Sequence, residues 1–181
     1  MIAKFIDMKN YIPEKILSGD DEKEIKLNIN TDESYIDLSY MTDHFNGSYK
    51  EHFISIPRKI NCNEETFEVL GLLQAEMGKT NNGCLTFTNS EYRLINKVMK
   101  WFDNELELSY NDWRWYIKVN MQEPQDENYK KEIESKLINH WLSKTKINNE
   151  MKHPKTVTYI KDTEHKKLRD YYYGTLIIEY K

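Results

Sequence analysis

Hydrophobic residues recur at two spacings along this chain, one typical of strands and one typical of helices. Residues 113–120 alternate strictly between apolar and polar side chains, which predicts a strand with one buried face. Residues 91–106 place apolar side chains three and four positions apart, which predicts an amphipathic helix capped by Ser90. Residues 132–146 show the same helical spacing, and residues 175–180 read as a strand. The pattern therefore predicts a mixture of helices and strands.

The first third of the chain has the pattern of short antiparallel strands. Its extended segments cover residues 24–30, 34–41 and 51–57, and clusters of Asn, Asp and Gly separate them. A further strand is predicted over residues 156–161. We expect an α+β fold in which helices pack on one face of a mostly antiparallel sheet. An N-terminal extension of short strands (residues 1–54) then precedes the main domain (residues 55–181).

Length and composition narrow the class of protein. A chain of 181 residues suits one domain with a small appendage. Its net charge of -4 argues against a broadly basic protein that coats nucleic acid. No apolar run reaches the length of a membrane span, and residues 1–4 do not begin a signal peptide. Cys62 and Cys84 form no CxxC motif, so we expect reduced thiols and a cytoplasmic location. Because the apolar runs are short, we expect no membrane partner.

Basic residues concentrate late in the chain. Residues 144–169 carry eight Lys and Arg against three acidic residues, whereas residues 1–60 carry more acids than bases. Screening limits the reach of distant acidic groups to about 10 Å, so a local basic segment of an acidic protein can still bind a polyanion. The alternative interpretation is a solvated, lysine-rich surface.

The helix predicted near residues 65–77 contains the most informative residues. Gly71 and Ala75 are four positions apart, which lets two helices approach closely. The helix is apolar nearly all round, so we expect it to be buried on several sides. Glu76 lies in its last turn, where a carboxylate faces the negative end of the helix dipole unless a divalent cation is bound. The alternative is an exposed glutamate beside a turn.

Polar side chains on the predicted strands form a candidate binding face. On residues 113–120, the side opposite the apolar residues carries cations, an amide and a hydroxyl at intervals of about 6–7 Å, which suit phosphates and base edges. The turn after the apolar helix is also within reach of a duplex. The candidate nucleic-acid contacts are Lys79, Asn81, Asn82, Thr86, Thr88, Arg114, Tyr116, Lys118, Asn120 and Lys161. The alternative is an ordinary solvated sheet face.

The sequence Val69-Leu70-Gly71-Leu72-Leu73-Gln74-Ala75-Glu76-Met77 resembles the motif helix of the LAGLIDADG homing endonuclease family. The predicted turn, strand, helix and strand that follow are similar too, so the resemblance covers roughly residues 55–121. The tail, with Trp141 in a helix and residues 173–178, is similar to tails of single-motif prokaryotic members.

This resemblance implies a fold, a site and a partner. In the family, two motif helices pack together, and each supplies one acid that holds a divalent metal at the scissile phosphates. By position, Gly71 and Ala75 are the packing residues, and Glu76 is the catalytic and metal-binding acid. The chain departs from the pattern because the acid is Glu and because Met77 replaces the closing glycine. A single motif implies a homodimer.

Three functions follow as hypotheses. The first is a homodimeric, double-strand DNA-binding endonuclease that uses Mg²⁺ at Glu76, with Lys118 orienting water or neutralising the transition state. The second is a catalytically silent relative that binds DNA or RNA as a regulator or splicing factor. The third is a protein-interaction domain that dimerises through the Gly71 helix.

Overall fold

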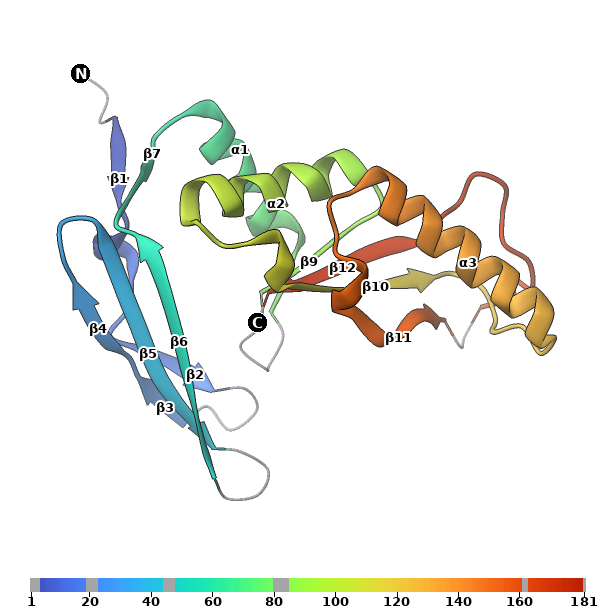
Figure 1. Ribbon diagram of the computed structural model, residues 1–181, viewed down its shortest axis with the longest axis horizontal. Coiled ribbons are helices and arrows are strands. Elements are labelled where there is room, and N and C mark those ends of the chain that lie inside the picture. The colour runs from blue at the N-terminus through green and yellow to red at the C-terminus, as the bar shows by residue number, and fades with distance from the viewer. Residues whose placement is uncertain (1–3, 19–22, 44–47, 80–84, 161–162, 181) are drawn as a thin grey trace.

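The computed structural model describes residues 4–18, 23–43, 48–79, 85–160 and 163–180, which form an α+β fold (Figure 1). Helices lie on one face of a mostly antiparallel sheet, and short strands precede them, which confirms the fold class expected from the sequence. None of the helices in these residues is both long and apolar enough to cross a membrane.

A five-stranded sheet forms the centre of the C-terminal part. Its strands are β8 (Met77–Lys79), β9 (Leu85–Asn89), β10 (Trp113–Val119), β11 (Lys152–Tyr159) and β12 (Thr175–Tyr180). Their order across the sheet is β11-β10-β12-β9-β8. Neighbouring strands are antiparallel except β10 and β11, which are parallel. A parallel pair requires a long crossover connection, and a helix between the two strands provides it.

Three α-helices flank this sheet. They are α1 (Glu64–Glu76), α2 (Tyr92–Leu106) and α3 (Glu127–Lys144), and three 3₁₀ turns are η1 (Met8–Tyr11), η2 (Tyr110–Asp112) and η3 (Asn149–Met151). Figure 1 shows α2 and α3 on the same side of the sheet. The N-cap of α2 is Glu91, which accepts a hydrogen bond from the Arg93 N–H at 3.2 Å, so the prediction of Ser90 as the cap is wrong. α3 begins earlier than predicted because Asp126 caps its first turn.

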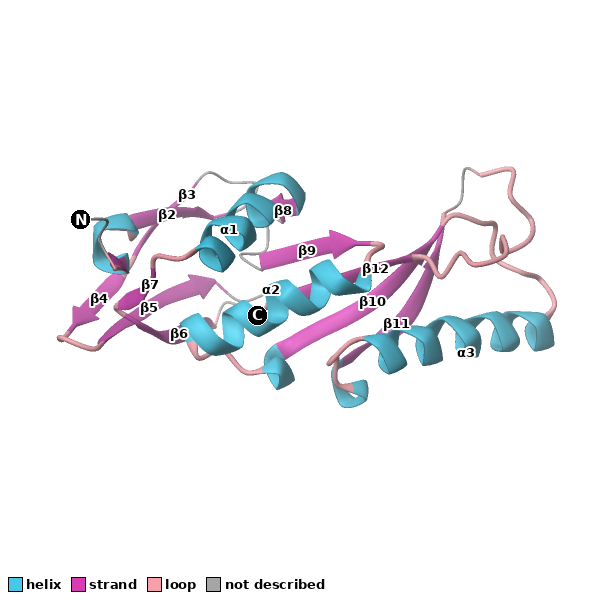
Figure 2. Ribbon diagram, turned by 90° about the horizontal axis from the view of Figure 1, so that it is seen from above, coloured by secondary structure: helices cyan, strands magenta, loops and turns pink. Residues whose placement is uncertain are grey.

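Short strands group together at the N-terminal end of the molecule (Figure 2). They are β1 (Phe5–Asp7), β2 (Lys15–Ser18), β3 (Lys23–Lys26), β4 (Asn28–Thr31), β5 (Tyr35–Asp43), β6 (Tyr49–Pro57) and β7 (Lys59–Asn61). β4, β5 and β6 form an antiparallel sheet, and β2 pairs with β3 and β1 with β7. The expected boundary after residue 54 falls inside β6, and the division into two domains stays a prediction.

The N-terminal strands and the helices share one apolar core. Ile36 of β5 and Ile56 of β6 are buried in the same cluster as the inner faces of α1 and α2. At the end of α2, the Glu105 carboxylate accepts hydrogen bonds from the backbone N–H and the side-chain amide of Asn61 at 2.8 and 3.0 Å. The N-terminal strands are therefore attached to the helices by packing from β5 and β6 and by hydrogen bonds from β7.

β10 supplies the centre of the core beneath α2. Trp113, Trp115, Ile117 and Val119 are all fully buried, as the strict alternation along this strand predicted. Phe102 of α2 packs edge-on against Trp113, with their ring centroids 5.1 Å apart. Each fully buried large side chain contributes about 1.5–3 kcal/mol through loss of apolar surface from water.

α1 differs from the prediction in its burial. Of its residues, three are buried: Thr66, Val69 and Leu73. Phe67 is 58% exposed and Leu70 is 40% exposed. The expectation that this helix is buried on several sides is therefore wrong for a single chain, because α2, β8 and β9 contact one face of it.

Candidate nucleic-acid interface

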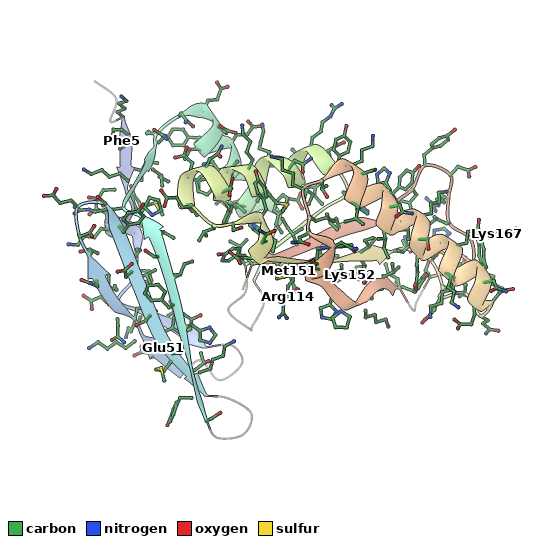
Figure 3. The ribbon with its side chains drawn as sticks, in the orientation of Figure 1. Phe5, Glu51, Arg114, Met151, Lys152 and Lys167 are labelled. Atoms are coloured by element: carbon green, nitrogen blue, oxygen red, sulfur yellow. The ribbon has the colours of Figure 1, made fainter. Side chains whose placement is uncertain are left out.

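The face of the five-stranded sheet opposite α2 and α3, here called the polar face, holds most of the predicted contacts that the structure describes. Strand alternation and register assign to it Thr86, Thr88, Arg114, Tyr116, Lys118, Thr158, Thr175, Ile177 and Glu179. Arg114 lies directly opposite Glu179, which in turn lies opposite Thr86. Figure 3 shows Arg114 on the side of the sheet away from α2 and α3.

Two exposed cations lie along β10 on this face. Arg114 and Lys118 are separated by four positions, so their Cα atoms are about 13 Å apart. Within the described part of the chain, neither side chain has an ion-pair partner within 4 Å. Their charges are therefore available to an external anion, as the sequence predicted for these two residues.

Tyr116 lies between the two cations and is half-buried. Burial, with a further contribution from the Glu179 carboxylate, raises the pKa of its hydroxyl, so this group stays protonated near neutral pH and can donate a hydrogen bond. The ring of His153, at the start of β11, lies 5.9 Å from the Tyr116 ring. The parallel pairing of β11 with β10 thus brings the exposed Lys152 and His153 beside the polar face.

The nucleic-acid contacts predicted from the sequence did not include Lys152, His153 or Glu179. The basic segment around residues 144–169 was the available signal for the first two. Sequence alone did not reveal that this segment pairs with β10 rather than lying elsewhere on the surface. Glu179 belongs to a predicted strand, but only the observed register of β12 against β10 shows that it lies opposite Arg114.

Two threonines of β9 differ in accessibility. Thr88 is half-buried, whereas Thr86 is 6% exposed and its hydroxyl has no hydrogen-bond partner among the described residues. The sequence-based expectation that Thr86 is an accessible contact is therefore wrong for this structure. Thr86 pairs with Gly78 of β8 and Glu179 of β12, and strand alternation alone does not indicate its burial.

The remaining predicted contacts are distributed around the sheet. Lys79 is the last residue of β8, so the predicted turn begins later than expected. Asn120 is exposed just beyond β10, and its backbone N–H donates to the Tyr172 hydroxyl at 3.2 Å. Asn81, Asn82 and Lys161 lie outside the described residues.

Glu76 is the last residue of α1 and is exposed. It immediately precedes β8, at the edge of the sheet. β9 and β12 separate β8 from β10, so at the usual spacing between strands the backbone of Lys118 is at least about 14 Å from that of Glu76. The structure does not bring these two predicted catalytic residues together within one chain.

A magnesium site needs more than Glu76. Among the described residues, no three His, Cys, Asp or Glu side chains form a group that could hold a metal ion. Mg²⁺ is usually held by one or two carboxylates together with waters and substrate phosphates. One chain therefore does not fit a complete magnesium site through its described residues, and a second carboxylate from another copy would be required.

The exposed side of α1 carries two large apolar residues and two small ones, together with the polar residues Glu68 and Gln74. Phe67, Leu70, Gly71 and Ala75 are spaced three and four positions apart and are exposed, and we call them the α1 stripe. Apart from its chain neighbours and the backbone of α1 itself, no described atom lies within 4 Å of a Cβ atom added at Gly71. Gly71 and Ala75, predicted as packing residues, are thus on the exposed side of α1.

Comparisons with known proteins do not identify the chain. No family model, curated protein or solved structure matches it. The resemblance to the LAGLIDADG family therefore rests on the sequence of the motif helix and of the segments after it, and no match supports it. The family and the function of this chain therefore stay predictions.

Proposed function

We propose that this chain is a double-strand DNA-binding protein that acts as a homodimer. The polar face of the sheet is the DNA-binding surface, and the α1 stripe is the contact between the two copies. The observation that carries the proposal is the pair of exposed cations, Arg114 and Lys118, on a sheet face that α2 and α3 leave uncovered. Side chains on a pair of strands suit the major groove, which admits a two-stranded ribbon.

The distribution of charge supports this proposal in spite of the acid excess. Charges farther from the duplex than about 8–10 Å are largely screened at physiological salt, so local groups dominate the interaction. Locally, Arg114, Lys118 and Lys152 outnumber the carboxylate of Glu179 on and beside the polar face. Each phosphate contact made by such a cation releases condensed counterions, which makes binding depend on salt.

The α1 stripe supports the homodimer. Phe67 and Leu70 expose apolar surface, and Gly71 and Ala75 leave room for the backbone of a second helix. A two-fold dimer pairs the same surface of both copies, so the α1 stripe of one copy packs against the α1 stripe of the other. If the two-fold axis runs along the two α1 helices, their Glu76 residues lie at the same end of the dimer.

The first candidate activity is endonuclease cleavage by the dimer. Its support is the exposed position of Glu76 at the end of α1, next to the α1 stripe. The Glu76→Gln variant keeps the shape of the side chain and removes its charge. For a nuclease, this variant loses cleavage of a duplex library in Mg²⁺ and keeps duplex binding. Retained cleavage by the variant would contradict the assignment.

The second candidate is a binding protein without cleavage. The specific observation in its favour is that the described part of one chain offers a single carboxylate at the expected metal position, far from Lys118. For such a protein, wild type and Glu76→Gln bind the same duplexes with similar affinity, and neither cuts them.

A salt-titrated gel shift with mixed-sequence duplex tests the common part of both candidates. Wild type binds at low salt, and Lys118→Ala lowers the slope of log affinity against log salt by about one. The matched control is Lys131→Ala, which removes an exposed cation from α3 instead. If wild type fails to bind even at low salt, the chain is better described as a protein-interaction domain that pairs through α1.

A further inference from the structure

We infer that Arg114 and Glu179 together select a G·C base pair at one position of the bound duplex. This inference rests on the proposed DNA binding and adds to it the residues that determine sequence preference. It involves Glu179, which the sequence pattern did not mark as a contact.

The two side chains are held side by side by the sheet. Arg114 of β10 and Glu179 of β12 are direct cross-strand partners, so their Cβ atoms are about 4.5–5.5 Å apart. Both are on the polar face, because strand alternation and register place Arg114 and Glu179 on the same side of the sheet as Tyr116. No ion pair shorter than 4 Å joins Arg114 to Glu179 or to any other described residue. Each group therefore retains hydrogen-bonding capacity for a ligand.

The chemistry of the pair matches the two halves of one base pair. In the major groove, guanine presents the acceptors O6 and N7, to which a guanidinium donates two hydrogen bonds. Cytosine presents the N4 amino group, which donates to a carboxylate. A·T and T·A pairs lack this combination of two acceptors on one base and an amino donor on the other. The Arg114–Glu179 pair is therefore complementary to a G·C pair and to no other pair in the same orientation.

The position of Glu179 also argues against a role in holding phosphates. A carboxylate repels the DNA backbone, so on a phosphate-binding surface it lowers affinity for every sequence. A carboxylate that accepts from cytosine N4 discriminates between sequences instead, and base contacts of this kind carry the sequence information of an interface. Glu179 is half-buried among Arg114, Tyr116 and Thr86, which restricts the directions its carboxylate can take.

The test is selection of duplexes from a randomised library by wild type, Glu179→Gln and the control Glu132→Gln, which removes an exposed carboxylate on α3. Wild type and the control enrich G·C at one position. Glu179→Gln loses roughly tenfold of that preference, because an amide bonds adenine well, and its overall affinity stays equal or rises.

The outcomes separate this inference from the proposed function. The thermal unfolding midpoint of each variant is measured beside the selection. If Glu179→Gln binds duplex with the same base preference as wild type, Arg114 and Glu179 do not read bases, whatever the unfolding midpoint of the variant. If the wild-type chain binds no duplex at all, the proposed function fails and the inference fails with it. A changed preference with an unchanged thermal midpoint supports base reading over a purely structural cross-strand pair.

Discussion

α1 and α2 are neighbouring helices with opposite relations to the rest of the chain. α2 is strongly amphipathic, and its apolar side is buried against the sheet by six residues that include Trp101 and Phe102. α1 has apolar residues nearly all round, yet it buries three residues and exposes Phe67 and Leu70. The contrast teaches that apolar content alone does not identify what a helix contacts. The apolar side of α2 is buried within its own chain. We propose that the exposed apolar residues of α1 are buried by a second copy.

The largest effect is expected in α2, where Phe102→Ala removes a ring that contacts Trp101, Trp113 and Tyr180. Deleting such a buried aromatic side chain lowers the free energy of unfolding by about 3–5 kcal/mol. Urea denaturation at low protein concentration measures it. Phe67→Ala in α1 is the matched control and changes monomer stability by about 0.5 kcal/mol or less. Similar losses for both variants would erase the contrast between the helices.

The next effect concerns DNA binding through the α1 stripe. Leu70→Lys places a charge in the proposed contact between copies, so each duplex is held by one binding surface instead of two. We expect apparent duplex affinity to fall at least tenfold, about 1.4 kcal/mol, because the avidity of two linked sites is lost. Phe53→Lys in β6 is the control, since Phe53 is 68% exposed but lies outside the stripe. Equal losses for the two variants would assign the effect to charge in general.

A smaller effect is expected for Gly71→Ala, which should raise the stability of the single chain and weaken the association of two copies. Alanine is favoured over glycine in a helix by up to about 1 kcal/mol, and the added methyl group meets no described atom of the same chain. The dissociated chain therefore unfolds at higher denaturant. Association of copies weakens, because the methyl group keeps the second helix away. A variant that is both more stable and equally associated would show that Gly71 does not face a partner.

The smallest effect is a pH dependence of stability that comes from α3. Like α2, this helix buries apolar residues against its own chain. His140 stacks on Tyr173 with ring centroids 3.6 Å apart, and burial, with help from Lys144, lowers the pKa of its imidazole below the usual 6.5. The unfolded chain therefore takes up a proton before the folded chain does, and stability falls as pH drops below about 6.5. His140→Gln reduces that loss in denaturation series between pH 7 and pH 5. An unchanged pH dependence would assign the loss to other groups, of which His52 also has a pKa lowered by burial.

Sequence periodicity predicted the elements whose own residues determine them. β10 alternates strictly, so both its extent and its buried face followed from residues 113–119. α2 was predicted within one residue at its start, although the cap is Glu91 and not Ser90. β12, over residues 175–180, was predicted with the observed bounds. In each case the residues of the segment itself determine where the element begins and ends and which face is buried.

Features that depend on distant segments did not follow from the sequence. The pairing of β11 with β10, which places His153 next to Tyr116, is a property of the whole sheet. The burial of Thr86 is likewise not contained in the alternation of β9 itself. The exposure of Phe67 could not be predicted, since an apolar residue buried by its own chain and one buried by a partner look the same in sequence.

Sedimentation equilibrium of wild type and Leu70→Lys, measured side by side without DNA, tests the central claim that α1 joins two copies. The account predicts a reversible monomer–dimer equilibrium for wild type, with a dimer mass near twice 21.9 kDa, and a monomer for the variant. Wild type that remains a monomer across the concentration range, or a variant that dimerises equally well, would contradict it.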